Sequence, residues 1–368
     1  MKKLLTVVGT RPNFIKVTQF ARLLDRADLG LTHRLLHTGQ HHDDKMARVF
    51  FEQFNMMPDF FLNIEGGSAN AQISQIILGL ENILCNVYKA DMVLVVGDVT
   101  STLAAAICAN KLGIPVAHIE SGLRSSDRTM PEEINRIVAD DIADYCFVTE
   151  QSGLDNLHKM GKPSDQVFFV GNTMIDTLVA FEDAIQASTI LTSLKLRGGD
   201  FALMTMHRPA TVDYQDGLKW LVQVIKKITT TRPLVFPIHP RTRNNLIRFG
   251  LQSEFEAIPD VIFTDPLDYF SFQKLTASAR YVITDSGGVQ EETTFRQIPC
   301  ITLRPSTERP VTVTLGSNVL APTDLTEIAA LIDQIEAGDF KKSVIPPLWD
   351  GAATVRISEV LFQLFSKL

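Results

Sequence analysis

Residues 284–292, TDSGGVQEE, form the segment whose residue types point most directly to chemistry. They follow a short apolar run and lead into a helix-like stretch, which places Gly287 and Gly288 at the start of a helix. Glycine allows a ligand to approach the backbone closely, and the first amides of a helix offer unpaired N–H groups at its positive end. The segment therefore predicts a phosphate-binding turn at Ser286, although a tight strand-to-helix connection would have the same pattern.

Two glutamates that follow this turn favour a nucleotide site. A capping box places its acid three residues after the cap residue. Here that position holds Gly288 or Val289, and neither is acidic. Capping therefore does not explain Glu291 and Glu292, and one of these carboxylates could accept hydrogen bonds from a ribose.

Cations occur at two further junctions between an apolar run and a helix-like stretch. Arg11 and Lys16 follow the first apolar run, and Arg309 lies in a turn beyond the glycine segment. An arginine side chain forms forked hydrogen bonds with phosphate or carboxylate groups. These residues are candidates for holding a diphosphate, and the alternatives are a solvated helix start for the first two and a surface Arg–Glu pair for Arg309.

Three acids, Asp98, Glu120 and Glu132, are candidates for proton transfer or for stabilising a developing cation. Asp98 follows an apolar run and would by itself be an ordinary helix cap. Glu120 ends an apolar run, where an unpaired buried acid would be costly. Glu132 follows a proline at a candidate helix start, so it could simply complement the helix dipole.

His207 and His239 each end an apolar run in the second half of the chain. A histidine at such a position is often structural, so the Arg-Pro that follows His207 is what makes it a candidate. The sequence has no His-x-x-x-His or Glu-x-x-His pattern, and we therefore predict no metal site.

The elements that must position these residues form two similar series. Short apolar runs without alternation, separated by helix-length stretches, indicate parallel strands covered by helices. Each series opens with a run that leads into Arg-Pro and later has a run, a polar turn, a helix, an Ile-Pro and another run. We expect an α/β protein of two Rossmann-like domains that face each other across a cleft, with ligand residues at the carboxyl ends of the strands.

The composition limits the class of protein. A chain of 368 residues exceeds one ordinary core, and its net charge of -7 argues against a nucleic-acid binder. No apolar stretch approaches the roughly 20 residues of a membrane helix. The four cysteines are far apart in apolar settings, which predicts buried free thiols and a reducing, cytoplasmic environment.

Taken together, these segments resemble the UDP-N-acetylglucosamine 2-epimerase family in its non-hydrolysing, bacterial form. The resemblance covers nearly the whole chain in the order of the family. The matching stretches are GTRPNFIKV, HTGQHHDDKM, GDVTSTLAA, HIESGLRSSDRTMPEEINR, FVGNTMIDT, PIHPRTR, DPLDYFSF, TDSGGVQEET and TERP.

The resemblance implies a glycosyltransferase-B-like fold with domains at about 1–175 and 176–351 and a last helix, about 352–368, that packs back on the first domain. It also implies interconversion of UDP-N-acetylglucosamine and UDP-N-acetylmannosamine at C2, through elimination of UDP to 2-acetamidoglucal and re-addition, for surface polysaccharide precursors. The resemblance implies a homodimer that needs no cofactor or metal.

Carried over by motif, two groups of residues receive roles. The residues expected to surround the sugar are Asp98, Glu120, Glu132 and His207. The residues expected to hold the UDP-sugar are Arg11, Lys16, His239, Ser286, Gly287, Gly288, Glu292 and Arg309.

Other functions stay open at this point. The substrate could be another UDP-2-acetamido sugar, or the enzyme could hydrolyse the nucleotide sugar and release UDP and N-acetylmannosamine. A glycosyltransferase of the same fold would need an acceptor site, which no segment indicates. A non-catalytic sensor of nucleotide sugars would not require the three acids.

Overall fold

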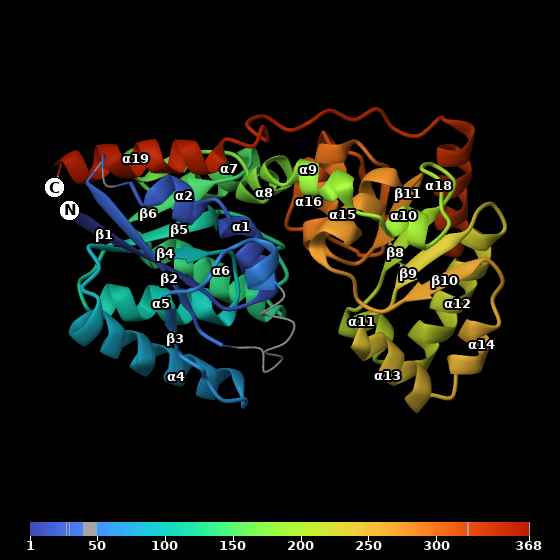
Figure 1. The fold of residues 1–368 in the computed structure, drawn as a ribbon, viewed down its shortest axis with the longest axis horizontal. Helices are drawn as coiled ribbons and strands as arrows, with labels where there is room; N and C mark the ends of the chain where they lie inside the picture. Colours follow the sequence, from blue (N-terminus) through green and yellow to red (C-terminus); the bar gives the residue numbers. More distant parts are fainter. Residues whose placement is uncertain (27, 29, 40–49, 322–323, 368) are drawn as a thin grey trace. The chain divides into compact units, whose positions relative to one another are not determined.

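The fold is described from a computed structural model, which covers residues 1–26, 28, 30–39, 50–321 and 324–367 (Figure 1). The side chains of Arg11 and Lys367 are outside this description. Residues 1–180 and 347–368 form unit 1, and residues 181–346 form unit 2. Each unit contains its own parallel sheet with helices, so the predicted α/β class with two Rossmann-like sheets is confirmed.

The sheet of unit 1 has the strand order β3-β2-β1-β4-β5-β6-β7 among the described residues. The strands are β1 (Lys2–Val8), β2 (Leu31–His37), β3 (Phe60–Phe61), β4 (Met92–Val96), β5 (Val116–Ser121), β6 (Tyr145–Val148) and β7 (Val167–Phe169). Strand β4, MVLVV, is buried along its whole length, as expected of a strand covered on both faces. The strand order reverses at β1 and β4, and ligands bind at such switch points in open α/β sheets.

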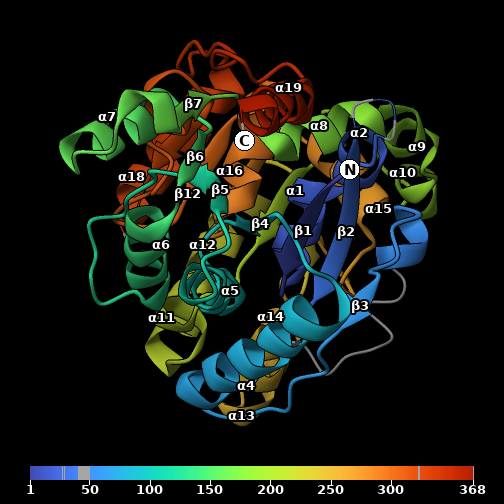
Figure 2. The ribbon, with the colours of Figure 1, turned by 90° about the vertical axis from the view of Figure 1, so that its left-hand side faces the viewer.

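The helices of unit 1 pack closely where their side chains are small. Helix α5 (Thr100–Lys111) contacts α4 (Ala69–Asn82) and α6 (Pro131–Ile142) (Figure 2), and its alanines at 104, 105, 106 and 109 are fully buried. Small side chains allow this close approach without leaving voids. The α-helices of this unit are α1 (Arg11–Val17), α2 (Phe20–Leu24), α4 (Ala69–Asn82), α5 (Thr100–Lys111), α6 (Pro131–Ile142), α7 (Gln151–Lys159), α8 (Thr173–Ala180) and α19 (Ala353–Lys367).

Unit 2 has the strand order β10-β9-β8-β11-β12-β13 among the described residues. The strands are β8 (Ala202–Thr205), β9 (Leu234–Pro237), β10 (Val261–Thr264), β11 (Tyr281–Thr284), β12 (Cys300–Thr302) and β13 (Asn318–Leu320). Helix α12 (Gln215–Thr229) buries Leu218, Leu221, Val222, Ile225 and Ile228, which recur with the period of a helix and join the main core of this unit.

The α-helices of unit 2 are mostly short. They are α9 (Glu182–Ala187), α10 (Ile190–Ser193), α11 (Pro209–Val212), α12 (Gln215–Thr229), α13 (Pro240–Arg248), α14 (Gln252–Glu256), α15 (Tyr269–Ser278), α16 (Gly287–Arg296), α17 (Pro310–Thr314) and α18 (Leu325–Ala337). Helices α11, α13 and α17 each have proline near the first position, where the missing N–H costs no hydrogen bond.

The chain returns to unit 1 after residue 346, and a buried segment fastens it there. The indole of Trp349 is buried and donates a hydrogen bond of 3.0 Å to the carbonyl of Thr149. The Asp176 carboxylate accepts the amides of Ala353 and Thr354, which begin α19. Helix α19 contacts α2 and α8 (Figure 2).

The burial of the four cysteines and the apolar character of the helices can be compared with the predictions from composition. Cys108, Cys146 and Cys300 are buried free thiols, and burial raises the pKa of Cys300 to about 11. Cys85 is a free thiol but is exposed, so the prediction of burial is wrong for this residue, which lies in a π-helical turn with only Leu84 buried. Over the described part of the chain, no helix has the length and apolar character needed to cross a membrane.

Candidate active site

The carboxyl ends of β1, β4 and β5 carry several candidate residues of unit 1. These strands are parallel neighbours in the sheet. Helix α1 begins directly beyond β1, and its Asn13 donates a hydrogen bond of 3.0 Å to the carbonyl of Val96 at the end of β4. The Asn13 side-chain oxygen also accepts the amides of Gly9 and Thr10. Asn13 therefore fixes the loop after β1 against β4. The sequence interpretation missed this residue, although its position three residues after Thr10 matches the spacing of a capping box.

Lys16 and Glu120 form a buried ion pair at this edge of the sheet, with side chains 7% and 5% exposed. Glu120 lies where the register between β5 and β6 shifts, and its φ of +67° is in the left-handed region. Non-glycine residues adopt this conformation rarely, and such strain gathers at functional sites. A Cβ atom on Gly97 would lie 3.2 Å from the Lys16 ammonium and 3.5 Å from the Glu120 carboxylate, so glycine leaves room for the pair beside Asp98.

Asp98 follows β4 and is held by helix α6. Its carboxylate forms an ion pair with Arg136, and its carbonyl accepts a hydrogen bond of 2.8 Å from the Asn135 side chain. The cap residue of helix α5 is Val99, so capping does not account for Asp98. The Asp98 side chain is 23% exposed whereas that of Arg136 is only 2% exposed, so Asp98 is the accessible end of the pair.

Glu132 and Glu133 are neighbours in the first turn of α6 but have different surroundings. Glu132 is exposed, and Glu133 is buried, where it pairs with Arg136 at 2.6 Å. The Glu133 carboxylate also accepts the amides of Ser125 and Ser126 at 2.9 and 3.2 Å. The sequence interpretation passed over Glu133 and Arg136, although their separation of three residues on a helix is a signal for an ion pair.

A second buried carboxylate on α6, Asp140, supports the loops after β4 and β5. The His118 ring lies with Nδ1 2.7 Å from Asp140 and with Nε2 2.8 Å from the carbonyl of Gly97. Asp140 also accepts the amide of Gly122 and a hydrogen bond from Arg124. Burial by itself would raise the pKa of Asp140, but His118 and Arg124 outweigh it and hold that pKa below its usual value.

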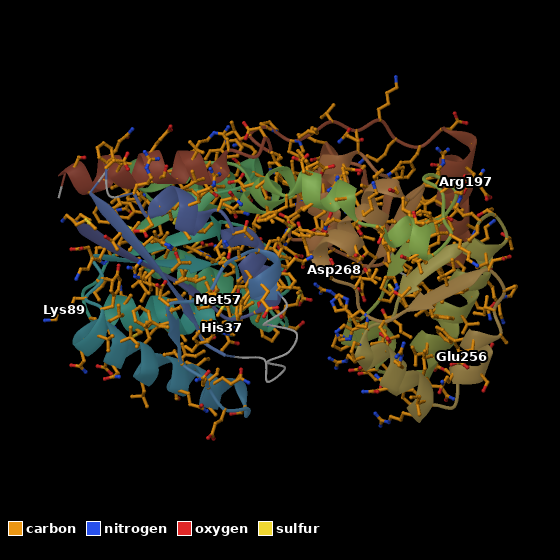
Figure 3. All side chains as sticks on the ribbon, in the orientation of Figure 1. His37, Met57, Lys89, Arg197, Glu256 and Asp268 are labelled. Atoms are coloured by element: carbon orange, nitrogen blue, oxygen red, sulfur yellow. The ribbon has the colours of Figure 1, made fainter. Side chains whose placement is uncertain are left out.

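Some candidates of unit 1 lie outside the described residues. The side chain of Arg11 is one of them, and residues 40–49, which include His41 and His42, are others. His37, labelled in Figure 3, precedes that stretch. It is buried, and its ring centroid lies 4.9 Å from that of Phe14. Its aromatic surroundings are those of a core histidine.

In unit 2, His207 and Asp285 follow the neighbouring strands β8 and β11. One oxygen of the buried Asp285 carboxylate accepts the amides of His207 and Arg208 at 2.8 and 2.7 Å. Its other oxygen lies 2.9 Å from Nδ1 of His207, whose ring is 41% exposed. Burial alone would raise the pKa of Asp285, but the His207 ring and the two amides outweigh it and hold that pKa below its usual value. Asp285 thus orients an accessible imidazole.

His239 lies beside this pair, with its ring centroid 5.5 Å from that of His207. It caps helix α13, and its Nδ1 accepts the amide of Arg241 at 3.1 Å. With Nδ1 as an acceptor, Nε2 carries the proton and can donate to a ligand. Burial lowers the pKa of His239, and the charge of His207 lowers it further.

Replacing Asp285 with asparagine is expected to reduce stability at neutral pH by about 2 kcal/mol, because charge-assisted hydrogen bonds weaken. Since the pKa of Asp285 is lower in the folded state, its contribution is complete above about pH 4 and is lost as the pH falls through the folded value. Urea unfolding of both proteins between pH 3 and 7 should show a gap that narrows on acidification. A gap independent of pH would contradict this account.

Helix α16 begins at Gly287, with Ser286 as its cap residue. The amide of Ser286 is engaged by the Thr284 hydroxyl, while the Gly287 and Gly288 amides belong to the first turn, which lacks intrahelical acceptors. A Cβ atom on Gly287 would lie only 2.8 Å from a Glu308 carboxylate oxygen. The Gly287 and Gly288 amides therefore lie at the helix start, and a side chain at position 287 would force the Glu308 carboxylate to shift.

Beside this turn lies a network of buried charged side chains. Arg309 pairs with Glu291 at 2.7 Å and with Glu308 at 2.8 Å, and Arg304 pairs with Glu308 at 2.9 Å. These arginines hold the pKa of Glu308 well below its usual range, although burial alone would raise it. Glu292 is buried near Tyr269, whose pKa is raised first by burial and then by the charge of Glu292. The interpretation of Arg309 as a surface pair is therefore wrong, because the pair is buried.

The geometry gives each unit a distinct chemical character. Unit 1 presents carboxylates and a lysine at the ends of its central strands, and unit 2 presents two imidazoles and a helix start rich in glycine. Within the described residues, no group of three or more His, Cys, Asp or Glu side chains has the arrangement of a metal site.

Comparison with known proteins identifies the family. The family model described as UDP-N-acetylglucosamine 2-epimerase matches residues 24–362. A UDP-N-acetylglucosamine 2-epimerase of Methanocaldococcus jannaschii is 35% identical over 366 residues, which are 98% of each chain. A UDP-2,3-diacetamido-2,3-dideoxy-D-glucuronate 2-epimerase of Pseudomonas aeruginosa is 38% identical over 322 residues, 86% of this chain and 88% of the relative.

Solved structures agree with these matches. The crystal structure of the M. jannaschii UDP-GlcNAc 2-epimerase in complex with UDP-GlcNAc and UDP has a TM-score of 0.87, at 35% identity, and the match covers 98% of this chain and 99% of that one. The UDP-GlcNAc 2-epimerase of Neisseria meningitidis bound to UDP-GlcNAc has a TM-score of 0.88 at 28% identity, covering 98% and 100% of the two chains. These matches extend over both units, and the chain belongs to the UDP-N-acetylglucosamine 2-epimerase family.

Proposed function

We propose that the protein is a non-hydrolysing isomerase that interconverts UDP-N-acetylglucosamine and UDP-N-acetylmannosamine by inversion at C2, for surface polysaccharide precursors. The observation that carries the proposal is the buried Lys16–Glu120 pair beside Asp98 at the ends of the central strands. In a member of this family, these groups have the chemistry that C2 inversion requires.

The reaction balances without a redox partner. A carboxylate removes the proton from C2, the C2–H electron pair forms the C1–C2 double bond, and the C1–O bond breaks with its electrons on departing UDP. In the second half, a UDP oxygen adds to C1 of the 2-acetamidoglucal intermediate and a proton returns to C2 on the opposite face. The chemistry therefore needs an acid or base near C2, stabilisation of positive charge near C1, and a cationic site for UDP.

The residues divide between these tasks in our proposal. The groups near the sugar are Asp98, Glu120, Glu132 and His207. The groups that hold the nucleotide are Arg11, Lys16, His239, Ser286, Gly287, Gly288, Glu292 and Arg309. Support comes from the local chemistry: carboxylates can stabilise a developing oxocarbenium-like charge, and helix amides with an arginine can stabilise departing diphosphate.

Incubation with UDP-N-acetylglucosamine in D2O tests the proposal. We expect deuterium to appear at C2 while the UDP-sugar stays intact. Proton NMR spectroscopy measures this exchange. Free UDP with deuterated N-acetylmannosamine would show hydrolysis instead. No exchange at C2 with any UDP-2-acetamido sugar would reject the epimerase and favour a transferase or a sensor.

A second substrate is supported by the P. aeruginosa relative, whose name specifies a diacetamido glucuronate and whose identity is 38%. The same mechanism would serve that sugar, because the C1 and C2 chemistry is shared. Parallel incubations with the two UDP-sugars distinguish them. Exchange only with the diacetamido sugar would keep the reaction type and change the substrate.

Gly287→Ala is expected to weaken UDP binding on the order of tenfold, which corresponds to about 1.4 kcal/mol. The added methyl group would approach the Glu308 carboxylate at 2.8 Å and the Arg309 guanidinium at 3.4 Å, and this carboxylate is held by two arginines. Calorimetric titration with UDP measures the change. Gly198→Ala is the matched control, since its nearest atoms would be 4.0 Å away. Equal affinities of the two variants would argue against a nucleotide site at this turn.

The proposal also includes a homodimer that works in the cytoplasm. Both follow from the resemblance to the family and from the nucleotide-sugar substrate. Light scattering should give about twice the 40.9 kDa chain mass. A monomer at micromolar concentration would remove the dimer from the proposal.

A further inference from the structure

The second turn of helix α6 holds both the backbone and the side chain of Asp98. The Asn135 amide donates to the Asp98 carbonyl at 2.8 Å, and Nη2 of Arg136 pairs with the Asp98 carboxylate. The two contacts come from consecutive residues on one rigid element. Asp98 is the only partly exposed member of the Asp98–Arg136 pair, so the buried Arg136 sets its orientation.

Arg136 is in turn fixed by Glu133. Nη1 of Arg136 lies 2.6 Å from Oε2 of Glu133, and both side chains are 2% exposed. The same Glu133 oxygen accepts the amide and the hydroxyl of Ser125, each at 2.9 Å, and the other oxygen accepts the Ser126 amide at 3.2 Å. Because backbone amides hold the carboxylate, Glu133 is the stationary end of this chain of contacts.

The planar guanidinium makes the arrangement directional. Arg136 uses one terminal nitrogen for Glu133 and the other for Asp98. A fixed Glu133 therefore sets the plane of the guanidinium, and this plane sets the direction from which Arg136 contacts Asp98. Removing the Glu133 charge would leave a buried guanidinium with one fewer carboxylate. The arginine would then turn or shift, and Asp98 would move with it.

We propose that Glu133 is a positioning residue, which holds Asp98 in its working orientation through Arg136. The inference rests on the proposed role of Asp98 in C2 epimerisation. It separates the two adjacent glutamates of α6: Glu133 acts through other residues, whereas the exposed Glu132 forms no ion pair with any of the described residues.

Glu133→Gln is the direct test. The glutamine oxygen can still accept from Ser125, but the charge facing Arg136 is gone. We expect kcat for C2 exchange to fall on the order of 10- to 100-fold, because displacement of a reacting group by about 1 Å can cost 10²-fold. KM and the affinity for UDP should stay within about twofold, since the nucleotide residues are not altered. Unchanged kcat would overturn the inference.

Two comparisons separate positioning from a general loss of stability. Glu133→Asp keeps the charge and should recover part of kcat relative to Glu133→Gln. Asp176→Asn removes another buried carboxylate of unit 1, which accepts the first two amides of α19. This change should lower the melting temperature and leave kcat unchanged. If Asp176→Asn and Glu133→Gln lower kcat equally, the effect is structural and the inference is wrong.

A double-mutant cycle with Arg136→Lys tests whether the effect passes through the arginine. Lysine keeps the charge but cannot bridge two carboxylates in a fixed plane. If Glu133 acts through Arg136, adding Glu133→Gln to Arg136→Lys should change kcat by less than about threefold. Losses that multiply in full would show an independent action and overturn the inference.

A crystal structure of the Glu133→Gln protein gives a readout that does not depend on activity. We expect the Asp98–Arg136 contact to be displaced and the Lys16–Glu120 pair to remain. An Asp98 side chain in its original place would overturn the inference even if the enzyme were inactive. Asp98 could be displaced in the Glu133→Gln structure while the wild-type protein shows no C2 exchange. That result would reject the proposed function but leave the positioning role of Glu133 intact.

Discussion

Glu120→Gln is expected to reduce C2 exchange in D2O by about 10²- to 10⁴-fold, the usual contribution of a positioned acid or base. Glutamine has nearly the same shape, so packing at the end of β5 is kept. It can neither take a proton nor stabilise a positive charge on the sugar ring. The buried Lys16 would also lose the charge that it faces.

The affinity for UDP distinguishes a role of Glu120 at the sugar from a role at the nucleotide. It should stay within a few-fold in Glu120→Gln, measured by calorimetry, because the proposed nucleotide turn lies on α16 of unit 2. Glu81→Gln, at an exposed position of α4, is the control and should behave as the wild type in both measurements. A large loss of UDP binding in Glu120→Gln would mean that the carboxylate serves the nucleotide through Lys16.

The largest loss of stability is expected from Gly171→Ala, about 2–5 kcal/mol from the sum of left-handed strain and overpacking. Gly171 has a φ of +88°, and a Cβ atom there would overlap the carbonyl oxygen of Leu348 and lie 2.9 Å from its carbonyl carbon. These are backbone atoms next to the buried Trp349, so the returning segment would have to move. Urea unfolding measures the change.

Gly161→Ala isolates the conformational part of this effect. Gly161 has a φ of +82° but nothing within 4 Å of the added Cβ. The strain alone should therefore cost about 1–2 kcal/mol. Equal losses in the two variants would show that the contact between Gly171 and the returning segment does not matter for stability.

The strands and their ends could be predicted because their signal is local. Buried parallel strands are continuous apolar runs, and a residue that follows such a run lies at the binding edge of the sheet. This reasoning predicted Asp98 and Glu120 at the carboxyl ends of their strands, where the structure has them. The same reasoning placed the glycine turn of residues 284–292 at a helix start, as observed.

The partners of these residues could not be predicted, because they come from distant parts of the chain. Lys16 and Glu120 are 104 residues apart, and His207 and Asp285 are 78 apart. No local pattern reports such pairs. The burial of Glu133 rather than Glu132 could not be predicted for another reason: both suit a helix start electrostatically, and only the packing of α6 decides which one is buried.

The segment that fastens Trp349 and α19 to unit 1 has a consequence for the order of biosynthesis. Unit 2 lies in the sequence between the two parts of unit 1, so residues 181–346 are synthesised before residues 347–368. A chain that ends at residue 346 therefore contains all of unit 2, whereas its unit 1 lacks the indole that bonds to Thr149 and the helix whose first amides Asp176 accepts. A released chain truncated after residue 346 should resist protease in its second unit and remain sensitive in its first.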